Sequence, residues 1–207
     1  MRLIYLLVAF FSVFTASAQK DGQAKAILDQ IGAKVKGSKG ILVSIQLISK
    51  NSSGKALGTK SINLKMKGDK YLLKQGLTEI LCDGSTIYNY DGVNSISKSN
   101  ITESDQTLSP QKLLSGNYDK DFNYSILSQN NNNATIELIP IDKRKNFQKV
   151  TLVIDKLKSA LSTATILDKS NNSSFVKVVS INYSAVLIDK IFLFDRAKYP
   201  KNVEIFD

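Results

Sequence analysis

The segment from Ile62 to Tyr90 decides the fold, and it reads INLKMKGDKYLLKQGLTEILCDGSTIYNY. Apolar and polar residues alternate along it, and β-branched and aromatic residues are frequent, which is typical of strands with one buried face. Three turn signals divide the segment: Gly68-Asp69, Gly76 and Asp83-Gly84. We therefore predict four short strands in an antiparallel meander, with one apolar face and one polar face.

A helix is predicted before the meander. Within residues 23–36, Ile27, Ile31 and Val35 recur every four residues and form an apolar stripe, which indicates an amphipathic helix that ends near Gly37. This stripe needs an apolar surface to lie on, and the strand predicted directly after it, residues 41–47, provides one.

A second, shorter helix is predicted after the meander. Ser109 followed by Pro110 is a typical helix start, Leu113 and Leu114 give the helix an apolar side, and Gly116 ends it. Such a helix is either a flap over a site or an ordinary connection, and the residues alone favour neither.

Further alternating segments raise the strand count to ten or eleven, in simple sequence order. The strands predicted outside the meander span residues 41–47, 93–99, 122–128, 134–141, 147–156, 160–168 and 174–183. A twisted sheet of this size must curl. It either closes into a barrel, filled by side chains or holding a ligand, or stays open with the helices covering its hollow.

The start of the chain has the pattern of a secretory signal peptide. Met1-Arg2 precede an apolar run that ends in Ala16-Ser17-Ala18, which predicts cleavage after residue 18 and one domain over residues 19–207. The first residue after the cleavage site is Gln19 and not a lipidatable Cys, so we expect a protein outside the cytoplasm that is not itself lipidated. The net charge is +10, but the lysines are scattered, and no nucleic-acid partner is expected.

The composition argues against catalysis. The chain has no His, and Cys82 is the single cysteine, so the commonest general base and the usual partner of a nucleophilic thiol are both missing. Glu79 and Asp83 are better explained as solvent-exposed and turn-capping carboxylates. We expect no catalytic residue, no metal site and no cofactor, and we expect Cys82 to be a buried, inert thiol.

Several features occur in a fixed order along nearly the whole mature chain. They are the helix Ala24–Val35, the turn Lys67–Tyr71, the segment Glu79–Tyr90, the Ser-Pro-x-Lys-Leu-Leu helix start, and the ending Ile191–Phe194 with Tyr199-Pro200. With these features the chain resembles the LolA family of outer-membrane lipoprotein carrier proteins. The resemblance implies a mainly β (α+β) fold, an unclosed antiparallel half-barrel with helices over its mouth as a lid.

The resemblance also implies a function and its partners. A periplasmic carrier of this family, expected as a monomer, receives acylated lipoproteins from an ABC-type exporter in the inner membrane and delivers them to an outer-membrane acceptor. From the facing of the strands, we predict that the acyl-chain cavity is lined by Val43, Ile45, Leu47, Ile62, Leu64, Met66, Tyr71, Leu73, Tyr88, Tyr90, Ile136, Leu138, Leu152 and Ile154. The predicted lid contacts are Ile27, Ile31, Leu113 and Leu114.

One position departs from the family pattern. Well-studied members carry an Arg before the first turn of the meander, bonded to the closed lid, whereas this chain has Lys67 or Gly68 there, depending on the alignment. Lys67 is a possible latch, but a lysine lacks the planar donor fork of arginine. Two other interpretations stay open: a binder of another amphiphile, such as a glycolipid or pigment lipid, and a β domain that acts through protein contacts.

Overall fold

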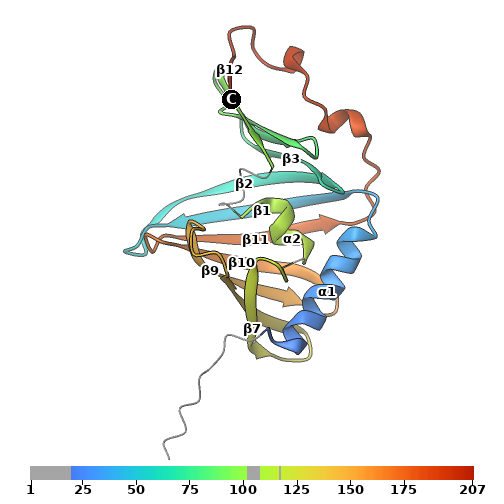
Figure 1. Cartoon of the computed structure of the whole chain (residues 1–207), viewed down its shortest axis with the longest axis vertical. Coiled ribbons are helices and arrows are strands. Elements are labelled where there is room, and N and C mark those ends of the chain that lie inside the picture. The colour runs from blue at the N-terminus through green and yellow to red at the C-terminus, as the bar shows by residue number, and fades with distance from the viewer. Residues whose placement is uncertain (1–19, 102–107, 117) are drawn as a thin grey trace, which may run out of the picture.

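The computed structural model of the chain describes residues 20–101, 108–116 and 118–207, and the predicted signal peptide lies outside these residues. In them, one sheet of twelve strands curls around two helices (Figure 1). The strands are β1 Ile41–Lys50, β2 Ala56–Lys67, β3 Lys70–Gln75, β4 Thr78–Cys82, β5 Thr86–Tyr90, β6 Ser95–Asn100, β7 Phe122–Gln129, β8 Asn133–Pro140, β9 Phe147–Asp155, β10 Ala160–Asp168, β11 Ser173–Asn182 and β12 Glu204–Phe206. The predicted fold class, an unclosed antiparallel half-barrel with covering helices, is confirmed.

The order of the strands differs from the simple sequence order that we predicted. The sheet runs β12-β6-β5-β4-β3-β2-β1-β11-β10-β9-β8-β7, so two meanders are joined through the pairing of β1 with β11. The chain leaves the sheet between β6 and β7, where α2 lies, and these two strands do not pair. The sheet stays open because its two edge strands, β12 and β7, do not pair with each other.

The strand that sequence reasoning missed is β12. It pairs in parallel with β6 over three residues, Glu204 beside Ser95 through Phe206 beside Ser97. β12 has only three residues, Glu-Ile-Phe, and all of them are exposed. A strand this short shows no alternation of apolar and polar residues that would mark it in the sequence.

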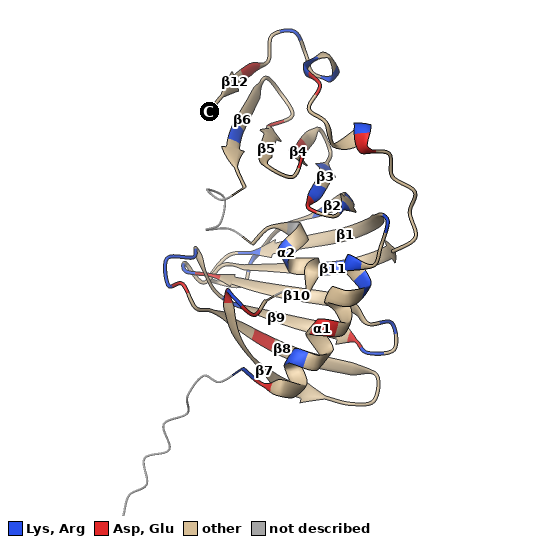
Figure 2. Cartoon of the chain, turned by 45° about the vertical axis from the view of Figure 1, so that its right-hand side comes forward, with Lys and Arg blue, Asp and Glu red and all other residues tan. Residues whose placement is uncertain are grey.

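Both predicted helices are present. α1 spans Gly22–Lys36, with the Asp21 carboxylate accepting the backbone N–H groups of Gln23 and Ala24. α2 spans Pro110–Ser115, is capped by the Ser109 hydroxyl, and ends at Gly116 in the left-handed conformation with φ of 69°. Figures 1 and 2 show the two helices on the same face of the sheet.

The main apolar cluster lies between these helices and the inner face of the sheet. α1 contributes Ala24, Leu28 and Ile31, while α2 contributes Leu113 and Leu114. Strands from both meanders supply the remainder, so this cluster holds the two halves of the sheet and the helices together.

The C-terminal segment crosses the outer face of β3, β4 and β5. It contains two 3-10 helices, η2 Asp189–Phe192 and η3 Arg196–Lys198, and Phe192 packs fully buried against Leu72 and Leu81. The polar face that we predicted for this meander is therefore partly apolar. It is covered by the end of the chain.

Candidate ligand cavity

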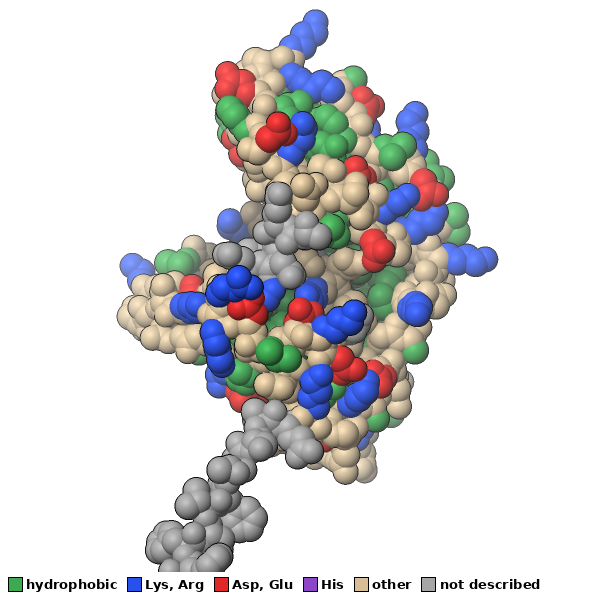
Figure 3. Space-filling model, viewed as in Figure 1, with side chains coloured by type: hydrophobic (Ala, Val, Ile, Leu, Met, Phe, Trp, Pro, Cys, Tyr) green, Lys and Arg blue, Asp and Glu red, His purple; other side chains and the backbone are tan. Residues whose placement is uncertain are grey.

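A cavity of about 810 Å³ opens between α1, α2 and the inner face of the sheet. Its apolar floor is formed by Ile41 of β1, Met66 of β2, Tyr71 of β3 and Ile87 of β5. Polar and charged side chains of α1, α2, the β2–β3 turn and the segment after α2 form its rim, and charged side chains surround apolar ones over the helices in Figure 3. An apolar floor with a charged rim suits a ligand that has an apolar and a polar part.

Of the side chains predicted to line a cavity, Met66 and Tyr71 do so. Eight others are buried in the main apolar cluster, where they contact protein: Val43, Ile45, Ile62, Leu64, Ile136, Leu138, Leu152 and Ile154. Leu47 and Leu73 are half-buried against the same cluster. These ten residues face the concave side as predicted, but their contact with a ligand stays a prediction that requires the helices to move.

Tyr88 and Tyr90 lie on the opposite face of the sheet, which corrects their assignment to the cavity. Residues paired across strands share a face, and β4 pairs Cys82 with Ile87 and Leu81 with Tyr88. Because Cys82 and Ile87 belong to the inner cluster, Tyr88 points outward. The turn before β5 sets this register, and an error of one residue in a turn inverts every facing after it.

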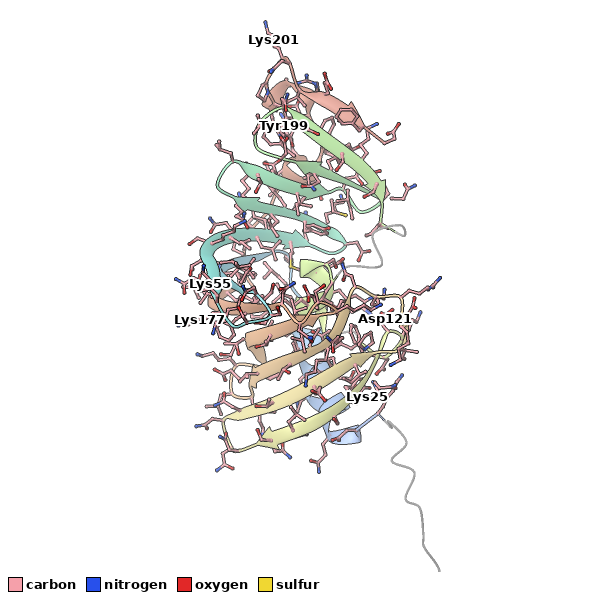
Figure 4. The ribbon with its side chains drawn as sticks, turned by 90° about the vertical axis from the view of Figure 1, so that its left-hand side faces the viewer. Lys25, Lys55, Asp121, Lys177, Tyr199 and Lys201 are labelled. Carbon is pink, nitrogen blue, oxygen red and sulfur yellow. The ribbon has the colours of Figure 1, made fainter. Side chains whose placement is uncertain are left out.

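The outward tyrosines hold the C-terminal segment. The Tyr88 ring stacks on Phe194 with a centroid distance of 4.3 Å, and Tyr90 contacts Tyr199 edge-to-face at 5.1 Å. The Tyr199 hydroxyl also donates to Glu79 Oε1 at 2.6 Å. Figure 4 shows Tyr199 at the end of the molecule away from Lys25 and Asp121, so these tyrosines are remote from the rim of the cavity.

The two helices touch through glycines. A Cβ atom on Gly116 would lie 2.4 Å from the Leu28 carbonyl oxygen and 2.6 Å from the Gly32 nitrogen. A Cβ on Gly32 would in turn lie 3.1 Å from the Ser115 carbonyl oxygen. The crossing of α1 and α2 therefore depends on backbone-to-backbone contact that a side chain at Gly116 would prevent.

Polar contacts fix the end of α2 to the segment that follows. The Lys112 ammonium lies 2.6 Å from Asp121 Oδ2, and the buried Tyr118 hydroxyl donates to the Leu113 carbonyl at 2.6 Å. Burial raises the pKa of Tyr118 above its usual value. The hydroxyl therefore remains a hydrogen-bond donor at neutral pH.

The start of α1 is anchored to the edge strand β7. Asp21 accepts the backbone N–H of Ile126 at 3.2 Å, and Lys25 contacts Asp119 at 2.8 Å. Tyr124 also donates to Asp119. The Lys25 ammonium, followed by the Tyr124 hydroxyl, holds the pKa of the Asp119 carboxyl below its usual value. These contacts attach the start of α1 to the edge of the sheet.

Gln111, which sequence reasoning did not single out, joins α2 to the β2–β3 turn. Its Nε2 donates to the Gly68 carbonyl at 3.2 Å and to Asp69 Oδ1 at 2.9 Å. Lys67, the predicted latch, instead contacts Asp189 Oδ2 at 3.0 Å and the Leu187 carbonyl at 3.2 Å, both in the C-terminal segment. A single amide in a short helix gives no pattern in the sequence, so only the fold identifies this contact.

Replacing Gln111 by alanine is expected to loosen α2. The loss of one side chain that makes two exposed hydrogen bonds costs about 1 kcal/mol, or roughly a fivefold rise in the opening equilibrium. Hydrogen exchange of residues 110–116 should accelerate accordingly, while the same change at Gln46, which is exposed on β1, should leave that exchange unaltered. Equal exchange in the two variants would mean that Gln111 does not hold the helix.

Cys82 and Tyr71 lie side by side in the inner wall. Burial raises the pKa of the Cys82 thiol, which donates to the Asp69 carbonyl at 3.6 Å, and burial followed by the nearby thiol raises the pKa of Tyr71 to about 12. Both groups are neutral at physiological pH. The described part of the chain has no cluster of three or more His, Cys, Asp or Glu suited to a metal ion.

The fold and the cavity define the class of protein: an open half-barrel, with twelve strands in the described residues, whose helices cover an apolar-floored cavity. Within that class, the sequence profile of the outer membrane lipoprotein carrier protein LolA matches residues 77–195, more than half of the 207 residues, and the chain belongs to this family. The comparison with curated proteins finds no match.

Solved structures include one with the same fold over most of the chain. An uncharacterized conserved protein from Thermus thermophilus aligns with a TM-score of 0.59 at 12% identity, over 88% of this chain and 98% of that one. A LolA superfamily protein from Nitrosomonas europaea aligns with a TM-score of 0.49 at 15% identity, over 83% and 97% of the two chains. The lipoprotein LppX from Mycobacterium tuberculosis aligns with a TM-score of 0.45 at 19% identity, over 81% and 99%.

The helices of the protein are short. Among the residues that the structure describes, none of the helices combines the length and the apolar character needed to cross a bilayer.

Proposed function

We propose that the protein carries lipoproteins through the periplasm by enclosing their acyl chains between the half-barrel and its helices. The observation that supports this most directly is the apolar-floored cavity of about 810 Å³ beneath the lid, in a chain of the LolA family. A cavity of this size falls within the range of about 300–1,000 Å³ typical of ligand sites.

The energetics favour partial burial of the chains and a movable lid. Each buried methylene contributes about 0.8 kcal/mol, so complete burial of two long acyl chains would exceed the roughly 18–21 kcal/mol at which non-covalent affinity saturates. Release would then be very slow. Opening the lid offsets part of this burial energy, because α1 and α2 must leave the apolar cluster that they fill in the closed state.

At the cavity, the Gln111 amide joins α2 to the β2–β3 turn through exposed hydrogen bonds. The start of α1 contacts the edge strand β7 and Asp119. We infer that α2 and the final turns of α1 move first, which would connect the cavity to the buried side chains of β1, β2, β8 and β9 that we predict to contact acyl chains.

The proposal extends to the route of the cargo. The chain from residue 19 onward would act in the periplasm after signal-peptide cleavage, with an ABC-type exporter as donor and an outer-membrane protein as acceptor. Its own surface would need no lipid anchor, since the cargo supplies the membrane affinity.

Binding of a triacylated lipopeptide to the purified chain from residue 19 onward tests the proposal. We expect saturable displacement of a hydrophobic fluorescent dye. Val35→Asn, on the cavity wall, should weaken the lipopeptide roughly tenfold by the loss of apolar contact. The matched change at Val186, which is 95% exposed, should have no effect. A folded protein that releases no dye in the presence of lipopeptide would refute the carrier function.

Mass spectrometry of the protein isolated from its native periplasm separates the proposal from the two alternatives. Co-purified lipoprotein supports the carrier. Free glycolipid or pigment lipid would instead favour a binder of another amphiphile, and a protein partner without lipid would favour a domain that acts through protein contacts.

A further inference from the structure

We propose that the cavity recognises an anionic group attached to the acyl chain, and that Lys36 at the end of α1 binds it. This inference rests on the proposed function, because it assigns the polar part of the ligand whose apolar part occupies the cavity. The ligand class is an acyl chain joined within a few bonds to a carboxylate or phosphate. The anion can belong to a lipid headgroup or to an acidic residue next to a lipidated cysteine.

The charges on the rim are unevenly distributed. Beside the crossing of the helices, the cavity is lined by two cations, Lys112 and Lys120, and two carboxylates, Asp29 and Asp121. Lys112 is paired with Asp121, and Asp29 is paired with Lys25 outside the lining. The charges at this end of the rim therefore cancel.

The other end of the rim, between the last turn of α1 and the β2–β3 turn, carries an excess of positive charge. Lys67 and Lys70 share a single carboxylate, with distances of 3.0 Å and 3.2 Å to the two oxygens of Asp189. Asp69 accepts the Gln111 amide. Together with Lys36, three cations stand against two carboxylates, and Figure 2 shows the basic positions at the end of α1 and beside β2 and β3.

Lys36 is the cation at this end whose ammonium is available. It lines the cavity and is exposed, and among the described residues no hydrogen bond or ion pair engages its Nζ. The negative end of the α1 dipole amounts to about half an elementary charge, while Lys34 and Lys36 both lie in the last turn. The negative end of the dipole therefore offsets less than the positive charge of one of these two lysines.

The floor beside Lys36 sets where the chain would lie. Ile41 and Met66 are buried and line the cavity next to Lys67 and Ser38, so an acyl chain on this floor would bring its polar end to the Lys36 edge. Burial of the chain fixes the position of the anion, which lowers the entropic cost of an ion pair that would be weak on an open surface.

Two matched pairs of probes test the inference by equilibrium binding. The first is a diacylated lipopeptide with Asp or Asn after the lipidated cysteine, and the second is lysophosphatidic acid or the monoacylglycerol of equal chain length, which lacks the phosphate. We expect the anionic member of at least one pair to bind about three- to tenfold more tightly at low salt, with the difference shrinking at roughly 0.5 M salt. The pair that shows the preference identifies the source of the anion.

Charge reversal locates the site. Lys36→Glu should abolish the preference for the anionic member while the affinity for the neutral member stays, and Lys36→Arg should retain it. Lys39→Glu provides the matched control, since Lys39 is exposed three residues away and does not line the cavity. Circular dichroism verifies that each variant is folded.

The outcomes separate the inference from the proposed function. Equal binding of neutral and anionic probes by the wild-type protein overturns the inference and leaves the carrier function standing. Equal loss of preference in Lys36→Glu and Lys39→Glu also overturns it, because general surface charge would then be the cause. Failure of every acylated probe to bind overturns both.

Discussion

Replacing Gly116 by alanine is expected to separate α2 from α1 and open the cavity. Two effects add: Gly116 has φ of 69°, and the new Cβ would lie 2.4 Å and 2.6 Å from backbone atoms of α1. The left-handed conformation costs an alanine about 1 kcal/mol, and a contact with rigid backbone adds to it, so we expect a loss of roughly 2–4 kcal/mol in lid attachment. Faster hydrogen exchange of residues 110–116 and stronger dye fluorescence would report the opening.

Gly76 offers a control that separates the two effects. It has φ of 57°, but a Cβ there would meet nothing within 4 Å. Gly76→Ala therefore measures the conformational cost alone, and the excess in Gly116→Ala measures the clash with α1. Gly116→Ala with the same stability as Gly76→Ala, and with unchanged exchange in α2, would show that the helices adjust without separating.

Replacing Phe192 by alanine is expected to release the C-terminal segment from the outer face of the sheet. The Phe192 ring is fully buried against Leu72 and Leu81, and removal of a buried phenylalanine costs about 3–5 kcal/mol. Release of the segment from residue 187 onward would also expose Tyr88. Urea unfolding should show the loss of stability, and limited proteolysis should cleave the segment while the remaining sheet persists.

Leu193 is the matched control, because it follows Phe192 directly and is 53% exposed. Leu193→Ala should cost less than about 1 kcal/mol. If Phe192→Ala resisted proteolysis as the wild type does, the attachment would instead depend on the aromatic contacts of Tyr199 and on the ion pairs of Asp189.

The C-terminal segment and the cavity are linked through Lys67. This residue lines the cavity and also contacts Asp189, so displacement of the segment would free a second ammonium at the rim beside Lys36. The Lys67 and Lys70 ammonium groups hold the pKa of the Asp189 carboxyl below its usual value. The contact therefore persists at neutral pH and weakens only in acid, as the carboxylate becomes protonated.

The sequence by itself determined the two α-helices and eleven of the twelve strands in the described residues. Alternation placed the strands, Gly68 and Gly76 marked turns, Ser109 and Gly116 marked the two ends of α2, and these features depend only on residues a few positions apart. The family resemblance supplied the open half-barrel and the lid, which local patterns had left as one of two alternatives.

Only the tertiary structure decided how distant parts meet. The pairing of β1 with β11, the parallel strand β12, the outward facing of Tyr88 and the contact of Gln111 with Gly68 all join residues whose association leaves no local periodicity. Each depends on register and chain crossing, where a shift of one residue exchanges the two faces of a strand. For that reason the concave face was largely predictable from the sequence, whereas the lid contact and the covering of the outer face were not.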